Sequence, residues 1–119
     1  MSKDLGQKGE EIACRWLASQ GYKIRHANWR FGHKELDIVA VKDNVLHIVE
    51  VKTRMEGHID EPADAVGRSK QKNIVDAAEA YIYAYELELE ICFDIIFITM
   101  SGTAPENIDY IEDAFTPYG

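Results

Sequence analysis

Three acidic side chains and one lysine stand at the outer ends of two apolar segments that the sequence predicts to pair as a β-hairpin: Glu35, Asp37, Glu50 and Lys52. In such a hairpin Asp37 faces Glu50. Glu35 and Lys52 also face each other. Because side chains alternate along a strand, all four side chains lie on one face of the sheet, and Leu36 lies on the opposite face. Two facing carboxylates repel, and a cation between them relieves the repulsion. Their oxygens suit Mg²⁺ or Mn²⁺, and Lys52 can hold an attacking water or stabilise charge that develops on a phosphate.

The hairpin itself follows from the turn between the two segments. Residues 35–41 and 45–53 are rich in β-branched and other apolar side chains, and Asp43-Asn44 between them favours a two-residue turn. Apart from the charged cluster and His47, both faces of this hairpin are apolar. That pattern is typical of a hairpin in the interior of a sheet that helices cover on both sides.

A purely structural role also accounts for the same charged residues. Glu35 and Lys52 can form a cross-strand ion pair, while Asp37 and Glu50 extend into solvent at the end of the sheet. Charged residues are common at strand ends, so the geometry alone does not decide between an ion pair and a cation site.

The composition is that of one globular domain, residues 1–119. Of its 119 residues 46% are hydrophobic, which is enough for one core and too many for a disordered chain. No stretch is long and apolar enough to cross a membrane, and the first residues do not resemble a signal peptide, so a cytoplasmic location is expected. Cys14 and Cys92 have no CxxC partner; two reduced thiols are expected, with a disulfide between them as the alternative.

Charge is distributed unevenly along the chain. The net charge is −8, which argues against a nucleic-acid partner when taken as a whole. However, all 13 Lys and Arg residues lie in residues 1–72 with 11 of the 21 acidic residues, whereas residues 73–119 hold the other 10 acidic residues and no Lys or Arg. Phosphate binding depends on the local potential, so one face of the protein can still be basic.

The hydrophobic pattern predicts a single α/β domain with the element order αβββαββ. The expected elements are helices over residues 5–20 and 66–87 and strands over 22–31, 35–41, 45–53, 91–100 and 108–112, with a polar loop over 54–65. Such an order places a central mixed sheet between flanking helices.

The residues of the hairpin and those on either side of it resemble a known family. Asp37, an apolar strand, a turn and then Glu50-Val51-Lys52 resemble the D…ExK signature of the PD-(D/E)xK, or restriction-endonuclease-like, nucleases. A longer series is similar to the YraN-like family, a poorly characterised bacterial group that is similar to archaeal Holliday-junction resolvases. The matching residues are Gly9-Glu10-Glu11-Ile12-Ala13, Gly21-Tyr22, Asn28-Trp29-Arg30, Glu35-Leu36-Asp37, Val49–Arg54, Val66, Lys70 and Phe93-Asp94. The resemblance covers nearly the whole chain and implies a restriction-endonuclease-like fold.

The resemblance implies a role for each acidic residue. Asp37 and Glu50 would be ligands of Mg²⁺ or Mn²⁺, aided by the backbone carbonyl of Val51. Glu10, on the first helix, would complete the catalytic group, and Glu35 matches a further acidic residue of the family.

It also implies roles for the basic residues. Lys52 would be the catalytic lysine of a reaction that hydrolyses phosphodiester bonds in structured or branched DNA. Arg30, Lys34, Arg54 and Lys70 would contact the nucleic acid. Resolvase-like relatives act as dimers, so a homodimer is expected, because a two-fold assembly suits symmetric cleavage of two strands. Two alternatives stay open: a nucleic-acid-binding protein of the same fold with little or no catalysis alone, and a purely structural or interaction protein.

Some aromatic residues and histidines lie near these groups. Trp29 and Phe31 can stack on unpaired bases, with packing in the core as the alternative. The four histidines show no metal-ligand spacing along the chain, and His47 is expected to be a packed, hydrogen-bonded side chain.

Overall fold

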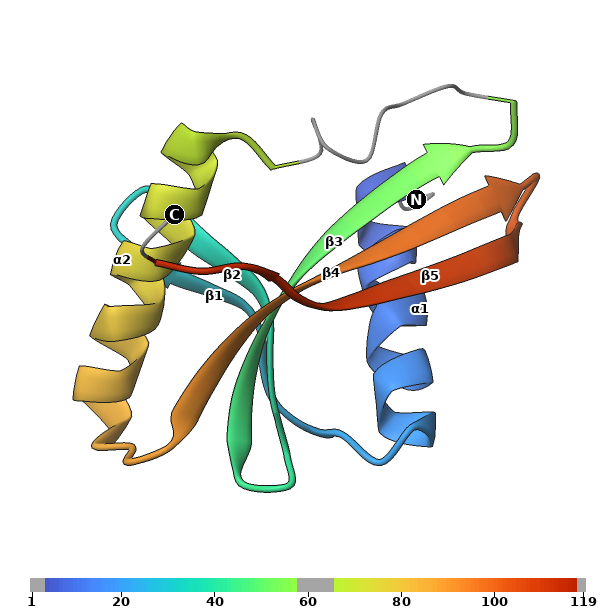
Figure 1. Cartoon of the computed structure of the whole chain (residues 1–119). Coiled ribbons are helices and arrows are strands. Elements are labelled where there is room, and N and C mark those ends of the chain that lie inside the picture. The colour runs from blue at the N-terminus through green and yellow to red at the C-terminus, as the bar shows by residue number, and fades with distance from the viewer. Residues whose placement is uncertain (1–3, 58–65, 118–119) are drawn as a thin grey trace.

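Two helices cover opposite faces of one five-stranded sheet (Figure 1). The computed structural model describes residues 4–57 and 66–117. The elements are α1 (Leu5–Ser19), β1 (Lys23–Phe31), β2 (Lys34–Lys42), β3 (Val45–Met55), α2 (Arg68–Tyr85), β4 (Glu90–Ser101) and β5 (Ala104–Phe115). This confirms the predicted α/β class and the order αβββαββ. Within the described part of the chain, neither helix combines the length and the apolar character needed to cross a membrane.

The sheet has the strand order β1-β2-β3-β4-β5, with antiparallel pairing except between β3 and β4. Parallel neighbours need a long connection, and α2 provides it between β3 and β4. As a result β3 is the central strand of a mixed sheet, and the segments that flank it come from both halves of the chain.

The β2–β3 turn confirms the predicted hairpin register. Asp43 and Asn44 have φ angles of 51° and 62°, which are the left-handed values that a two-residue type I′ turn requires. Lys42 pairs with Val45, and the register continues without a shift to Ile38 opposite Val49.

Buried side chains form one cluster on each face of the sheet. On the α1 side they are Ala13, Leu17, Tyr22, Ile38, Ala40, Val49, Ile96, Ile98 and Met100. On the α2 side they are Leu36, Val39, Leu46, Ile48, Val66, Ile74, Ala77, Ala78, Tyr81, Phe93, Ile95 and Phe97. The expectation that β2 and β3 are interior strands with two covered faces is therefore confirmed.

Two strands are longer than predicted. β5 runs from Ala104 to Phe115 instead of residues 108–112, and β3 continues to Met55 into the predicted polar loop. β5 is an edge strand, so many of its side chains stay in solvent and its polar sequence hides its pairing with β4. Arg54 and Met55 pair with Thr99 and Met100 of the buried strand β4, which supplies the apolar partner that their own segment lacks. The rest of the predicted loop, residues 58–65, lies outside the described residues.

Helix α1 approaches β3 closely at Gly9. Asp4 caps the helix, its carboxylate accepting a hydrogen bond of 2.8 Å from the N–H of Gln7. A Cβ atom added at Gly9 would lie 1.8 Å from Oγ1 of Thr53. Glycine is therefore required at this position by packing, and the close approach carries the next residue of α1, Glu10, toward the acidic end of the hairpin.

This contact predicts that Gly9→Ala destabilises the protein. The methyl group must displace Thr53 or move the helix, and we expect the free energy of unfolding in urea to fall by about 1–3 kcal/mol. The matched control is Gly6→Ala in the same helix, where the nearest atom to an added Cβ is Oδ1 of Asp4 at 3.5 Å. That variant should be neutral or up to about 1 kcal/mol more stable, because alanine favours a helix more than glycine does. Equal stabilities of the two variants would contradict the close packing of α1 on β3.

Candidate metal centre

Strands β2 and β3 separate at the acidic end of the hairpin. Their backbone pairing ends at Ile38 and Val49, and beyond that point β2 continues beside β1 while β3 continues beside β4. Figure 1 shows β3 running on with β4 and β5 where β2 turns away with β1. The sequence predicts that Asp37 faces Glu50 and that Glu35 faces Lys52. Neither pair is a backbone pair in the structure, because the ladder ends one residue before Asp37 and Glu50.

The side chain of Asp37 occupies the point of separation. Its Oδ2 accepts a hydrogen bond of 2.9 Å from the peptide N–H of Val51 on β3. A carboxylate oxygen thus takes the position that a main-chain carbonyl of β2 would hold in a continuous ladder. The described contact of Val51 with the site is through its N–H, and its role as a carbonyl ligand stays a prediction.

Alternation of side chains is interrupted at the same place. Leu36 and Val39 both belong to the buried cluster on the α2 side, whereas Ile38 belongs to the cluster on the α1 side. In a strand with regular alternation, Leu36 and Val39 would lie on opposite faces, so the alternation that the sequence predicts is wrong at this place. Asn28, on the neighbouring strand β1 between the pairs on either side of Asp37, has a φ of 55°. The left-handed backbone of Asn28 makes β1 irregular directly beside the point where β2 changes face.

The irregularity groups two acidic residues of β2 with one of α1. Carboxylate oxygens of Glu10, Glu35 and Asp37 lie within 4.8 Å of one another. Burial raises the pKa of Glu10; a hydrogen bond from Asn28 opposes the rise, and the negative charge of Asp37 adds to it. Glu35 is one-third exposed and lies 3.6 Å from the guanidinium of Arg30. The ion-pair partner of Glu35 is thus Arg30. The alternative interpretation of the sequence, an ion pair between Glu35 and Lys52, is wrong.

A second charged group lies on the α2 side of β3. Glu50 is 4% exposed, and its Oε1 lies 2.7 Å from Nζ of Lys70 in the first turns of α2. Burial lowers the pKa of Lys52, and the neighbouring ammonium of Lys70 lowers it further. Burial also acts to lower the pKa of Lys70, but its hydrogen bond to Glu50 and the negative charge of that residue outweigh it and raise this pKa.

Asp37 joins the two groups. Burial and then the negative charge of Glu50 raise its pKa to about 7, while the N–H of Val51 and the charge of Lys70 act in the opposite direction. A carboxyl group with a pKa near neutrality in a cluster of other acids indicates an uncompensated concentration of negative charge.

The donor set fits a hard divalent cation. Glu10, Glu35 and Asp37 offer carboxylate oxygens close enough to share one ion, and Glu50 lies beside Asp37. Oxygen donors of this kind, in a partly exposed position that leaves room for water, suit Mg²⁺ and Mn²⁺. The structure thus brings together all four acids predicted from the sequence. It groups Glu10 with Glu35 and Asp37 and places Glu50 on the α2 side with Lys70, whereas the sequence predicted Glu35, Asp37 and Glu50 on one face.

Beside the acids, α1 and β1 form a surface pocket of 530 Å³. Its lining includes Glu10 of the acid group, the neighbouring Asn28 of β1, and Arg15 on α1. The acid group is therefore open to a ligand from the α1 side.

The basic residues predicted to contact nucleic acid lie around the site with different partners. The side chain of Arg30 contacts Glu35 and is 72% exposed to solvent. Nζ of Lys34 lies 2.9 Å from Asp76 on α2. Arg54 donates a hydrogen bond of 3.3 Å to Thr99 and lies over a buried aromatic ring of β4. Lys70 pairs with Glu50, as described above. Contact with nucleic acid stays a prediction for all four.

Trp29 and Phe31 have different environments. Trp29 packs against the α2-side cluster and meets the ring of Tyr81 edge-on, with centroids 5.0 Å apart. Phe31 is 51% exposed near the β1–β2 turn. Of the two, Trp29 is a core residue, and Phe31 is free to meet a ligand.

Sequence reasoning missed two parts of the site. It did not identify Asn28 as a site residue, although its backbone is left-handed beside Asp37 and its side chain bonds to Glu10. The resemblance implied a phosphate or site contact for Lys70, but not that its partner is Glu50. The available signals were an asparagine inside a strand, a residue that tolerates positive φ, and a lysine in the first turns of the second helix.

Comparison with known proteins places these residues in a family. The sequence model of the family described as "Uncharacterised protein family UPF0102" matches residues 9–98. A UPF0102 protein of Parabacteroides distasonis is 45% identical over 112 residues, 94% of this chain and 92% of the relative. One of Bacteroides thetaiotaomicron is 46% identical over 114 residues, covering 96% and 93% of the two chains. The protein FP2501 of Flavobacterium psychrophilum is 41% identical over 112 residues, covering 94% and 93%. The family resemblance inferred from the motifs is confirmed, and none of these names states an activity.

The raised pKa of Asp37 predicts how stability depends on pH in buffer that contains a chelator. The ordinary pKa of the carboxyl group is 3.8, and in the folded protein it is about 7. Between these values the folded protein holds a proton that the unfolded chain has lost, so this group's contribution to stability falls as the pH rises. Asp37→Asn removes the titrating group and keeps an oxygen that can accept from Val51. We expect it to be more stable than the wild type by about 1–3 kcal/mol at about pH 8, and the difference to shrink toward about pH 4.

Urea unfolding of both proteins across this pH range measures the effect. Asp43→Asn, at the exposed hairpin turn, is the control for loss of one negative charge and should show no such growth with pH. A stability difference for Asp37→Asn that stays constant over the range would contradict the burial of negative charge at this point.

Proposed function

The chain belongs to the uncharacterised protein family UPF0102, and we propose that it is a divalent-metal-dependent endonuclease that hydrolyses phosphodiester bonds in structured or branched DNA. The observation that carries the proposal is the position of Asp37. It lies between the carboxylates of Glu10 and Glu35 on one side and the Glu50–Lys52–Lys70 group on the other. A folded protein keeps such a repulsive group where a ligand of opposite charge compensates it.

In this proposal the acids of the site hold Mg²⁺ or Mn²⁺. Asp37 is the central ligand, with Glu10, Glu35 and Glu50 as further oxygen donors. When bound, the ion polarises the scissile phosphate and lowers the pKa of a bound water. The N–H of Val51 fixes the orientation of the Asp37 carboxylate, as the hydrogen-bonded groups behind metal ligands do in other proteins.

Lys52 supplies the positive charge next to these acids. Its half-buried position and the neighbouring ammonium of Lys70 favour the neutral amine more than at an exposed lysine. Such a group can orient a water molecule, or as the ammonium stabilise charge that develops on the phosphate oxygens. Lys70 forms an ion pair with Glu50 and, after burial, lowers the pKa of Lys52, and in this scheme it acts as a positioning residue.

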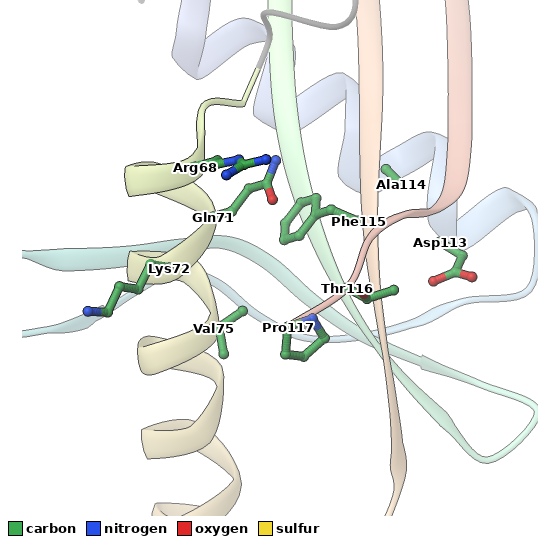
Figure 2. Close-up of a pocket in the computed structure, with 9 residues that line it drawn as sticks. All are labelled: Arg68, Gln71, Lys72, Val75, Asp113, Ala114, Phe115, Thr116 and Pro117. Carbon is green, nitrogen blue, oxygen red and sulfur yellow. The ribbon is translucent and has the colours of Figure 1, made fainter. Parts of the chain in front are cut away.

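Further basic residues flank the site and would contact the DNA backbone. Arg15 lines the pocket on the α1 side. On the α2 side, a pocket of 740 Å³ between the start of the helix and the end of the chain includes Arg68 and Lys72. Figure 2 shows Arg68 directed toward Phe115 across this pocket, whereas Lys72 points away from it. Contacts of this type position a phosphate backbone without reading its sequence, which suits a substrate recognised by its structure.

A second candidate function is binding of nucleic acid with little turnover by the isolated protein. One contact favours it: Nζ of Lys70 lies 2.7 Å from Glu50 and compensates the carboxylate that a metal would otherwise use. If this ion pair persists when DNA binds, a partner or a second copy of the chain has to displace it.

Cleavage of labelled DNA tests the proposal. With Mg²⁺ or Mn²⁺ present, we expect the wild type to cut four-way junctions or flaps faster than linear duplex. Asp37→Asn and Lys52→Ala should each lower the rate by at least about 100-fold, because each removes a charge that acts on the reacting phosphate. Lys42→Gln, at the other end of the hairpin, is the control and should keep the wild-type rate.

The outcomes separate the candidates. Cleavage that survives both site substitutions would show that another centre, or a contaminant, is responsible. Salt-dependent binding of the same DNAs without cleavage would favour the second candidate function. Absence of both binding and cleavage would leave a structural or interaction role.

A further inference from the structure

We propose that the protein has a second metal site, separate from the acidic centre, in which His47, Cys92 and Glu112 bind Zn²⁺ or a chemically similar transition-metal ion. A nitrogen, a sulfur and an oxygen of these three side chains lie within 4.8 Å of one another. The three residues come from β3, β4 and β5, which are adjacent strands of the sheet (Figure 1).

The strand register brings the first two ligands together. His47 and Cys92 are direct partners in the parallel pairing of β3 with β4. His47 contacts Tyr22 edge-on, with ring centroids 5.0 Å apart, which places it on the α1 side of the sheet. Glu50 lies on the α2 side with Lys70. The two centres therefore share strand β3, but the side chains that β3 gives to them, His47 and Glu50, lie on opposite faces of the sheet.

A β-bulge brings in the third ligand. The register of β4 with β5 shifts between Phe93 and Ile95, so that β5 has extra residues at this point, and Asp113 there has a φ of 55°. Bulges of this kind change the direction of a side chain and occur next to functional sites. Here the bulge lies next to Glu112, and the N–H of Asp113 donates a hydrogen bond of 2.9 Å to the buried Asp94.

Asp94 orients the histidine as a carboxylate behind a metal ligand does. It is fully buried, and its Oδ2 lies 2.6 Å from Nδ1 of His47. With a proton on Nδ1, the free ring nitrogen is Nε2, with its lone pair available to a cation. Pairs of a carboxylate and a histidine fix the tautomer and increase the basicity of the ligating nitrogen in many zinc sites. The hydroxyl of Tyr110 and the N–H of Asp113 also donate to Asp94, so the carboxylate itself is held in place.

Space and charge at the cluster also suit a metal. A pocket of 140 Å³ lined by His47, Glu112 and Tyr22 adjoins it and can hold a water molecule as a fourth ligand. Cys92 would bind as a thiolate and lose its proton to solvent. With Glu112 and Asp94 this gives three negative charges, which a divalent ion largely compensates.

The donor types distinguish this site from the acidic centre. Imidazole nitrogen and thiolate sulfur select Zn²⁺ and related transition metals, whereas a set of carboxylates selects Mg²⁺ or Mn²⁺. The spacing of the ligands along the sequence does not predict the site, because each ligand comes from a different strand. The expectation of a packed, hydrogen-bonded His47 is confirmed, and the proposal adds a ligand on its other nitrogen.

Titration of the protein with Co²⁺, a spectroscopic substitute for Zn²⁺, tests the proposal. We expect one equivalent of Co²⁺ to produce the near-ultraviolet absorption of a thiolate–cobalt bond, and Zn²⁺ to displace it. Cys92→Ser should abolish this band. Cys14→Ser, which removes the other free and half-buried cysteine, is the matched control and should retain it.

Two further variants make the outcome decisive. Glu112→Gln changes an exposed side chain and should weaken Zn²⁺ binding at least about tenfold in equilibrium dialysis without affecting folding. Asp37→Asn should leave the cobalt band unchanged, because Asp37 belongs to the acidic centre. A band of equal size in Cys92→Ser, or no cobalt band in the wild type with folding intact, would overturn the proposal and leave the cluster as a buried hydrogen-bond network.

Discussion

The hydrogen bond from the Val51 N–H to the carboxylate of Asp37 marks the constraint on which the candidate site depends. In a regular hairpin the backbone of β2 would satisfy this donor, and no side chain could enter between the strands. Because the ladder stops at Ile38 and Val49, one carboxylate becomes part of the backbone network and also part of a charged cluster. Separation of two central strands thereby converts the end of a buried hairpin into a site that residues from both helices can reach.

Each helix reaches this point by a different physical route. α1 lies so close to β3 that only glycine fits at position 9, and the carboxylate of Glu10 joins Asp37 and Glu35 as a consequence. α2 carries Lys70, whose charge compensates the buried Glu50. Burial and the charge of Glu50 keep the pKa of Asp37 well above its ordinary value, although the charge of Lys70 acts in the opposite direction. The folded protein thus retains a concentration of negative charge at the end of its central hairpin.

The sequence was sufficient for the class, the element order and the hairpin register, because these follow from apolar periodicity and from the Asp43-Asn44 turn. It also identified the charged residues, through their types and their resemblance to a nuclease signature. It could not place them on the correct faces. Alternation of side chains assumes an unbroken pleat, and β2 departs from it between Leu36 and Ile38, beside the left-handed Asn28 of β1. Partners that are distant in sequence, such as Lys70 for Glu50, arise from packing of α2, which periodicity alone does not determine.

The central claim is that the acids around Asp37 form a site for a hard divalent cation. Anomalous X-ray scattering from crystals grown with Mn²⁺ tests it most directly, since the ion itself provides the signal. The account predicts a peak coordinated by the Asp37 carboxylate and at least one of Glu10, Glu35 and Glu50, at about 2.1–2.3 Å from their oxygens. An intact pair between Lys70 and Glu50 with no anomalous peak beside Asp37, in crystals saturated with Mn²⁺, would contradict it.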